Sequence, residues 1–264
     1  MSQDLNDLLD GWPHEAGQIK VRKIMGSDGR EKVQLRLDLG LIQMEMTGRP
    51  DGTRPKSCES LLSYHQGRAM AAEKKGAKYE LSADDCGELQ QEGIQYYHRY
   101  LSLFQLEDFP AVVRDTARNL EMFAFVREHT DRDDITWAFD QFIPYVQMMH
   151  TRARASIDLE KRRVDAALKE IEKGRDLIVA FYNEHEQADA EKSAELAFLD
   201  EWKEELRAKQ PVSRTEKLRR EMESAISQEA YERAAQLRDE IRALDAKRSR
   251  KAAPRGGSRE ESED

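Results

Sequence analysis

The chain is poor in cysteine and lacks any long apolar run. Cys58 and Cys86 are the two cysteines of its 264 residues, and they are far apart. Such a pair suits neither a disulfide framework nor a cysteine-ligated zinc site, and free thiols are typical of a reducing compartment. The first residues are acidic and have no apolar signal-peptide core, and no run approaches the roughly 18 apolar residues of a membrane helix. We therefore expect a cytoplasmic protein with no membrane contact.

An excess of positive charge is also missing. The sequence has 43 Lys and Arg against 52 Asp and Glu, which gives a net charge of -9. Affinity for nucleic acid or anionic membrane needs clustered cations, so this balance argues against it in general but leaves room for a local basic patch. Charged residues make up 36% of the chain and the mean hydropathy is -0.84. These values are typical of long helices that bury one stripe and expose the rest.

Motifs of known chemistry are absent from the sequence. It contains no GxxxxGK[ST], GxGxxG or HExxH pattern and no Glu-x-x-His pair of the di-iron type. Its acidic pairs stand at expected helix starts, where the helix dipole favours them. The aromatic stripe at residues 137–146 is interpreted as core. We predict that the protein is not an enzyme and has no catalytic, cofactor or metal site, and no small-molecule substrate is evident.

The N-terminal part predicts a small antiparallel β element. After a flexible acidic leader at 1–17, residues 18–56 alternate apolar and polar side chains around a turn at Gly26–Gly29. The alternation changes phase after Gly40, which indicates a bulge or kink there. The polar positions include a possible basic face formed by Lys20, Arg22, Lys32 and Arg36.

From residue 57 onward the apolar period is helical, so the fold class is mainly α. We predict a helical bundle over 57–150, either a plain bundle or one with a TPR-like helix pair. Its helices cover 59–75, 82–106 and 110–128, and a last one starts at Asp134 and is kinked by Pro144. Over 151–210 an apolar heptad repeat predicts a long-helix or coiled-coil region, with a break near 186–192 and then a shorter apolar stripe, Leu199, Trp202 and Leu206, that could fold back on the first. The positions of the heptad repeat are Ile157, Val164, Ile171, Ile178 and His185.

Residues 211–245 predict an antiparallel pair of helices, followed by a disordered charged tail at 246–264. Ser213 and Glu216 form a capping-box pattern for the first helix, and Ser227 is the expected N-cap of the second. A hairpin of about 30 residues buries little surface by itself and needs a partner or a parent domain. The expected partner-docking residues are Leu218, Met222, Ala225, Tyr231, Ala234, Ala235, Arg238, Asp239, Ile241 and Leu244.

The order of these residues, with Tyr231-Glu232-x-Ala234-Ala235-x-x-Arg238-Asp239 at its centre, resembles the UvrB/UvrC (UVR) motif. That motif occurs in bacterial excinuclease subunits and in McsA-type activators and Clp-type ATPases of protein quality control. The resemblance implies a helical hairpin that contacts another protein and performs no chemistry. The zinc-binding cysteine pairs of McsA-type proteins are absent here, as are nuclease and helicase motifs. Neither kinase activation nor DNA incision is therefore implied.

Two main hypotheses follow for the function. The first is a non-catalytic adaptor or scaffold that docks a protein partner through the hairpin, or associates with itself. The second is a nucleic-acid-associated accessory factor in DNA repair or stress response, which would use the basic face of the β element. An enzyme without a recognisable motif is the remaining alternative.

Overall fold

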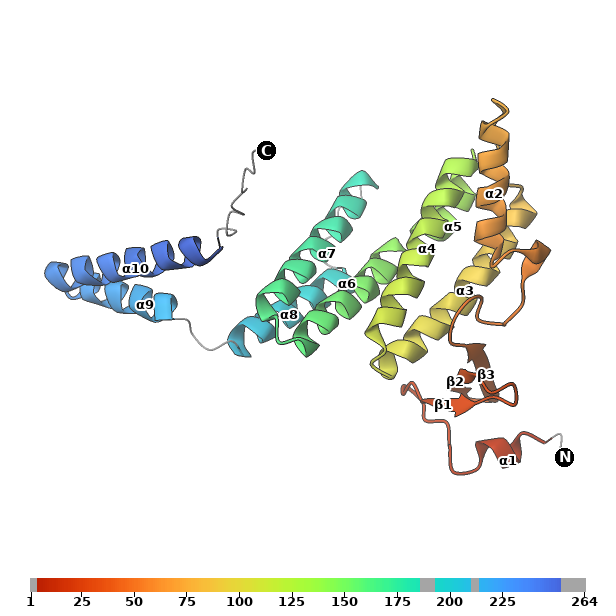
Figure 1. Cartoon of the computed structure of the whole chain (residues 1–264), viewed down its shortest axis with the longest axis horizontal. Coiled ribbons are helices and arrows are strands. Elements are labelled where there is room, and N and C mark those ends of the chain that lie inside the picture. The colour runs from red at the N-terminus through yellow and green to blue at the C-terminus, as the bar shows by residue number, and fades with distance from the viewer. Residues whose placement is uncertain (1–3, 186–192, 210–213, 253–264) are drawn as a thin grey trace, which may run out of the picture. The chain divides into compact units, whose positions relative to one another are not determined.

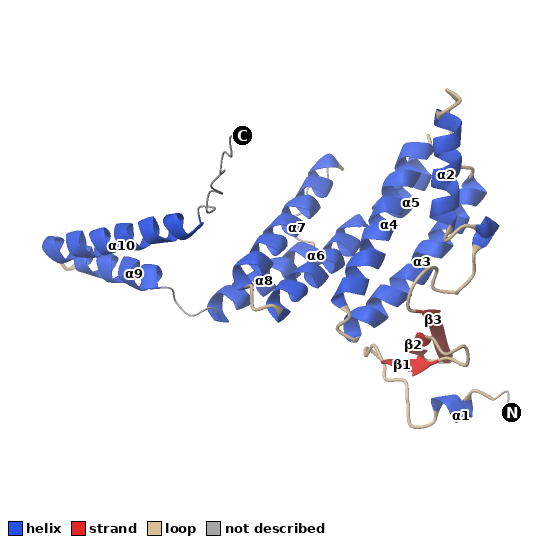
Figure 2. Cartoon of the chain, viewed as in Figure 1, coloured by secondary structure: helices blue, strands red, loops and turns tan. Residues whose placement is uncertain are grey.

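The computed structural model describes residues 4–185, 193–209 and 214–252, and it divides the chain into two compact units (Figure 1). The first unit is Met1–Leu206 and the second is Arg207–Asp264. Helices dominate both, and the strands form one small sheet near the N-terminus (Figure 2). The mainly α fold class is therefore confirmed. In the described part of the chain, none of the helices has both the length and the apolar composition that crossing a bilayer requires.

The sheet is an antiparallel meander of β1 (Val21–Met25), β2 (Glu31–Leu37) and β3 (Gly40–Glu45), in that order. This arrangement confirms the predicted β element, but the bulge at Gly40 was wrong. Leu37 pairs with Gly40, so Asp38 and Leu39 form a two-residue turn. In a hairpin of this register, odd-numbered residues of β2 pair with even-numbered residues of β3, so the two sets lie on the same side of the sheet. The turn by itself therefore changes the phase of the apolar positions, and Leu39 at its tip is 91% exposed.

One face of the sheet packs on the helices and the other carries polar side chains. Val33, Leu35 and Met44 are buried, and Leu106 packs against them. On the opposite face Arg22 donates a hydrogen bond to Gln34 (2.7 Å), and Gln34 donates one to Gln43 (2.9 Å), which links the three strands. The leader, which was predicted to be flexible, contacts this polar face. The guanidinium carbon of Arg22 lies 4.1 Å from the ring centre of Trp12.

The first unit contains most of the helices, which follow one another with short connections (Figure 1). A single turn, α1 (Asn6–Leu9), precedes the sheet, and a 3₁₀ turn, η1 (Pro55–Ser57), follows it. The bundle contains α2 (Leu61–Glu73), α3 (Ala83–Gln105), α4 (Phe109–His129), α5 (Asp133–Asp140), α6 (Ile143–Glu160), α7 (Val164–Glu184) and α8 (Ala194–Lys209). A helical bundle is thus confirmed.

Local signals explain where these helices begin. The Ser82 hydroxyl accepts a hydrogen bond from the Asp85 N–H (3.1 Å), and the Asp85 carboxylate accepts one from the Ser82 N–H (2.9 Å). This capping box opens α3 as predicted. Pro144 stands at the start of α6, where its missing N–H costs nothing. The predicted kink was therefore wrong, because α5 ends at Asp140 and a new helix begins at Ile143.

The heptad repeat does not form one continuous helix, and the break expected near 186–192 lies outside the described residues. The chain reverses at Lys161–Arg163, where Arg162 adopts a left-handed conformation with a φ of 56°. The helices α6 and α7 then run antiparallel, with an ion pair of 2.7 Å between Arg154 and Glu170. Their axes come close because Gly174 has no side chain where it meets Thr151. The heptad positions lie on two helices of the bundle, and the buried ones face its core.

A buried polar network joins the sheet to the bundle. The Arg99 guanidinium pairs with both carboxylate oxygens of Asp115 (2.7 and 2.9 Å), and it donates hydrogen bonds to the carbonyls of Glu45 (3.0 Å) and Gly48 (2.8 Å). Neither side chain of this ion pair is more than 1% exposed. Glu92 is fully buried as well, and it accepts a hydrogen bond from the first N–H of α2, that of Leu61 (2.7 Å). These contacts fix the connection between β3 and α2 against α3 and α4.

Candidate functional site

The second unit contains the hairpin that the sequence predicted, formed by α9 (Arg214–Ser227) and α10 (Tyr231–Ala252). The turn between them is closed by hydrogen bonds from the Ala230 N–H to the Ala225 carbonyl (2.8 Å) and from the Glu229 N–H to the Ile226 carbonyl (3.0 Å). Glu229 has a φ of 56°, a left-handed conformation that a side chain makes unfavourable. The antiparallel helical hairpin is therefore confirmed.

The limits of the two helices differ from the prediction. Ser227 is the last residue of α9, and its hydroxyl donates a hydrogen bond to the Ser224 carbonyl (2.8 Å). It does not cap the next helix as expected. The predicted capping box at Ser213 lies outside the described residues. At the other end α10 continues to Ala252, so the disordered tail does not begin at 246. Alanine and basic residues favour a helix there, and the positive charges suit its C-terminus.

The hairpin core is a single narrow seam. Leu237 is the most buried residue at its centre, with 1% of its surface exposed. Six of the ten predicted docking residues pack in this seam, namely Leu218, Met222, Ala225, Ala234, Ile241 and Leu244. Because these side chains contact each other across the two helices, their first role is to hold the hairpin together.

The other four predicted residues lie outside this core. Tyr231 is 67% exposed, and Ala235 is half-buried. Arg238 and Asp239 are exposed neighbours on α10, and their charged groups are 3.2 Å apart. Tyr231 was expected to lock the turn from the buried stripe, but it is the first residue of α10 and points to solvent.

Leu237 was missed by the sequence reasoning, although a signal was present. It follows Ala234 by three residues and precedes Ile241 by four, which is the spacing of one helical face. The predicted stripe was taken from the residues that resemble the UVR motif and not from the helical spacing of apolar residues. For that reason it included the exposed Tyr231 and left out Leu237, the most buried side chain of the hairpin.

The turn end of the hairpin exposes apolar surface within an acidic surrounding. Ile226 is 50% exposed at the end of α9, and Tyr231 follows directly after the turn. We call Ile226 and Tyr231 the turn pair. Glu229 lies between them in the chain and Glu232 follows, and both are exposed. An exposed aromatic ring and an exposed aliphatic side chain at the two ends of one turn are residue types on which protein contacts concentrate their binding energy.

The four cations of the predicted basic face share one face of the sheet, but each is already engaged. Lys20 pairs with Glu15 (2.5 Å), and Lys32 pairs with Glu45 (2.5 Å). Arg22 donates to Gln34 and stacks on a tryptophan, as described above. Arg36 donates to the carbonyls of Trp12 (3.0 Å) and Gly40 (2.8 Å). The carboxylates of Glu15 and Glu45 thus offset the charge of the two lysines, whereas the two arginines are held by uncharged groups.

Potential ligands for a metal are dispersed. Among the residues that the structure describes, no three His, Cys, Asp or Glu side chains lie close enough together to hold an ion. Cys86 is buried, and burial raises the pKa of its thiol, which keeps it in the less reactive protonated form.

Comparison with known proteins identifies the hairpin. The family model of the UvrB/uvrC motif matches residues 213–247, which span the hairpin, and the remainder of the chain is unassigned. The motif is seen in proteins of DNA repair and of protein quality control. Comparison with curated proteins gives no match, and neither does comparison with solved structures.

Proposed function

We propose that this protein is a non-catalytic cytoplasmic adaptor that docks a protein partner through its C-terminal UVR hairpin. One observation carries the proposal. The hairpin belongs to a compact unit of its own, its core is a single seam of small and medium side chains, and its turn pair of Ile226 and Tyr231 is exposed. A partner that covers this end would remove apolar surface from water that the hairpin alone leaves uncovered.

The charges around the turn pair favour a particular kind of partner. Glu221, Glu223, Glu229 and Glu232 are exposed within residues 221–237 around the turn, and Arg233 is the single cation of that segment. Arg233 lies 3.9 Å from Glu221 and partly offsets it. A complementary partner has an apolar depression for the turn pair and basic residues around it. Complementary charge of this kind speeds association and excludes wrong partners more than it adds affinity.

Nucleic acid is not proposed as the partner. The four cations of the sheet face are engaged with carboxylates, an aromatic ring and backbone carbonyls, and the chain carries a net charge of -9. Titration of a labelled DNA duplex in about 150 mM salt should show no saturable binding at low micromolar protein. Tight, salt-sensitive binding that is lost on Lys20→Glu with Arg22→Glu would support the DNA-repair hypothesis instead.

The test of the docking proposal compares full-length variants as bait. The double variant Ile226→Lys, Tyr231→Ala removes the turn pair without touching the buried seam, so its helical signal and melting temperature should stay the same. In an affinity pull-down, the double variant should fail to capture a partner that the unchanged protein captures. Leu177→Lys is the matched control, because Leu177 on α7 is 47% exposed against 50% for Ile226. A partner that binds both variants equally well would show that the turn pair is not the docking site.

A further inference from the structure

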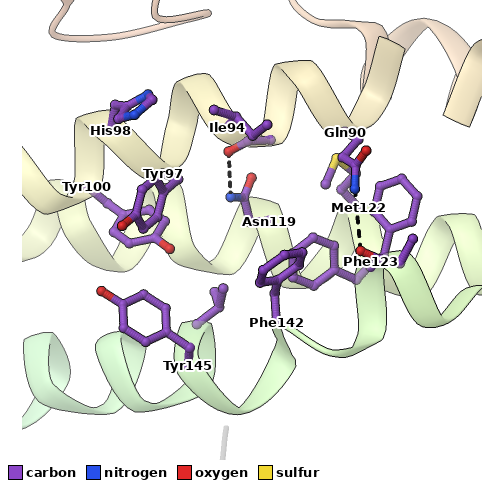
Figure 3. Close-up of a pocket in the computed structure, with 14 residues that line it drawn as sticks. Gln90, Ile94, Tyr97, His98, Tyr100, Asn119, Met122, Phe123, Phe142 and Tyr145 are labelled. Atoms are coloured by element: carbon purple, nitrogen blue, oxygen red, sulfur yellow. Dashed lines mark hydrogen bonds between the residues drawn. The ribbon is translucent and has the colours of Figure 1, made fainter. Parts of the chain in front are cut away.

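The first unit contains an apolar pocket whose walls come from α3, α4, α5 and α6 and from the α5–α6 connection (Figure 3). Its volume is about 460 Å³, within the range of pockets that hold small molecules. Ile94, Tyr97 and Phe142 stand at its rim, where they are 41%, 36% and 47% exposed. The aromatic segment that the sequence suggested to be core thus supplies part of an open pocket.

The walls of this pocket carry no charge. No Asp, Glu, Lys or Arg is among the residues that line it. His98 is the one histidine there, and burial lowers the pKa of its imidazole, so the ring is neutral at pH 7. Burial raises the pKa of Tyr100 and of Tyr145, which keeps both phenols protonated. A charged ligand would lose its hydration in this pocket and gain no counter-ion.

The amide side chains at the pocket are occupied by other contacts. Asn119 donates a hydrogen bond to the Gly93 carbonyl (3.0 Å) and accepts one from Arg118 (3.1 Å). Gln90 is within 3.5 Å of the Ala138 carbonyl, to which it donates. Both amides therefore brace the walls, and the tyrosine hydroxyls and the neutral His98 imidazole are further polar groups that can orient a ligand.

The pocket has two different ends. Figure 3 shows the rings of Tyr97, Tyr100 and Tyr145 together at one end and those of Phe123 and Phe142 at the other. The ring centres of Tyr97 and Tyr145 are 6.2 Å apart, and those of Tyr97 and Tyr100 are 5.5 Å apart with perpendicular planes. One end thus offers hydroxyl groups, whereas the other is mainly carbon, with the Gln90 amide and the Met122 sulfur beside the phenylalanine rings.

We propose that this pocket binds an uncharged, mainly apolar small molecule, an aromatic ring or a short acyl chain that carries a single hydroxyl or carbonyl group. The ring or chain lies against the phenylalanines, and the oxygen faces the tyrosine hydroxyls. The volume of the pocket and its uncharged walls favour such a molecule over a charged peptide segment. The inference concerns the first unit and is independent of the docking role of the hairpin.

A pair of fluorescent probes that differ in one charge tests the proposal. N-phenyl-1-naphthylamine is neutral, and 1-anilinonaphthalene-8-sulfonate carries the same rings with a sulfonate. Titrated into the full-length protein, the neutral probe should bind at one site with blue-shifted emission, at least tenfold more tightly than the anion. Equal affinity for both probes, or no saturable binding of the neutral one, would overturn the proposal.

Substitutions locate the binding. Ile94→Lys places a charge at the rim, where the exposed position tolerates it, and should weaken binding of the neutral probe at least tenfold. Met70→Lys makes a similar change on α2, away from the pocket and at a position that is 61% exposed, and should leave the affinity unchanged. Full affinity in Ile94→Lys would place the probe elsewhere and refute the site. If that variant loses its helical signal, Phe142→Ser serves as a second change at the rim, with the same expected loss.

Discussion

Substitution of Gly174 by alanine gives a sharp test of how α6 and α7 pack. A Cβ at position 174 would lie 1.9 Å from Oγ1, 2.5 Å from Cγ2 and 2.7 Å from Cβ of Thr151, all below the 3.0 Å that real Cβ atoms keep. The helices would have to separate, and such overpacking costs about 1–3 kcal/mol. Alanine offsets about 0.5–1 kcal/mol of this through its better helix propensity.

A contact as short as 1.9 Å places the cost in the upper part of that range, about 2–3 kcal/mol, so the net effect of Gly174→Ala should be a loss of about 1–2.5 kcal/mol in the free energy of unfolding. At about 2–4 °C per kcal/mol, the melting temperature of the first unit should fall by about 2–10 °C. Circular dichroism during thermal or urea unfolding measures both quantities.

Gly93→Ala is the matched control within the same unit. A Cβ there would meet the terminal methyl group of Met122 at 2.8 Å, and that flexible side chain can turn away. The free energy of unfolding of Gly93→Ala should equal that of the wild type or exceed it by up to about 1 kcal/mol.

A double variant checks the cause of the loss. In the double variant Gly174→Ala, Thr151→Ala, the Oγ1 and Cγ2 atoms of residue 151 are gone, but its Cβ would still lie 2.7 Å from the new Cβ at position 174. The second substitution should therefore restore part of the lost stability and not all of it. If Gly174→Ala proved as stable as the wild type, the close approach of α6 and α7 would be refuted.

Three more outcomes are expected. Leu237→Ala empties the centre of the hairpin seam and should cost about 2–5 kcal/mol, enough to melt the hairpin while the first unit keeps its melting temperature; an unchanged hairpin would contradict the seam. Ser82→Ala removes the cap of α3 and should cost about 0.5–2 kcal/mol in chemical denaturation, whereas the exposed Ser27→Ala should cost almost nothing. Stability should also fall from pH 7 to pH 5.5, because burial lowers the folded-state pKa of three histidines and the unfolded chain takes up protons first. They are His65, His98 and His150. Carboxylates with lowered pKa values, such as Asp28 at about 2, change their charge only at lower pH. A melting temperature that rises from pH 7 to pH 5.5 would therefore refute the lowered pKa values of these histidines.

Local patterns predicted much of the fold, and tertiary packing decided the rest. The alternation along β2, the capping box at Ser82 and the hairpin after Pro211 each depend on residues close together in the sequence, and each was predicted correctly. The heptad repeat failed because a period of seven does not reveal a chain reversal. Arg162 takes a left-handed conformation that its neighbours in the sequence do not indicate. The reversal is favoured by packing between α6 and α7, which includes the close contact of Gly174 with Thr151 and the ion pair of Arg154 with Glu170.

The candidate sites were predictable to different degrees. The seam of the hairpin follows helical spacing, so a strict period would have found Leu237. The apolar pocket could not be predicted, because its walls come from segments between residues 90 and 146 that meet only after folding. The four cations of the basic face lie on one side of the sheet, yet sequence alone did not show that Glu15, Glu45 and Trp12 engage them.

The ion pair of Arg99 and Asp115 has a consequence for how the first unit opens. Detaching β3 from α3 would break the hydrogen bonds of the Arg99 guanidinium to the Glu45 and Gly48 carbonyls and would uncover the apolar side chains of Val33, Leu35 and Met44. The free energy of such a local opening is high, so the sheet should not fray from the helices before the rest of the unit unfolds. Amide protons of β2 and β3 should therefore exchange with solvent at the same slow rate as those in the middle of α3 and α4. The small sheet at the start of the chain is, in this respect, part of the most protected region of the protein.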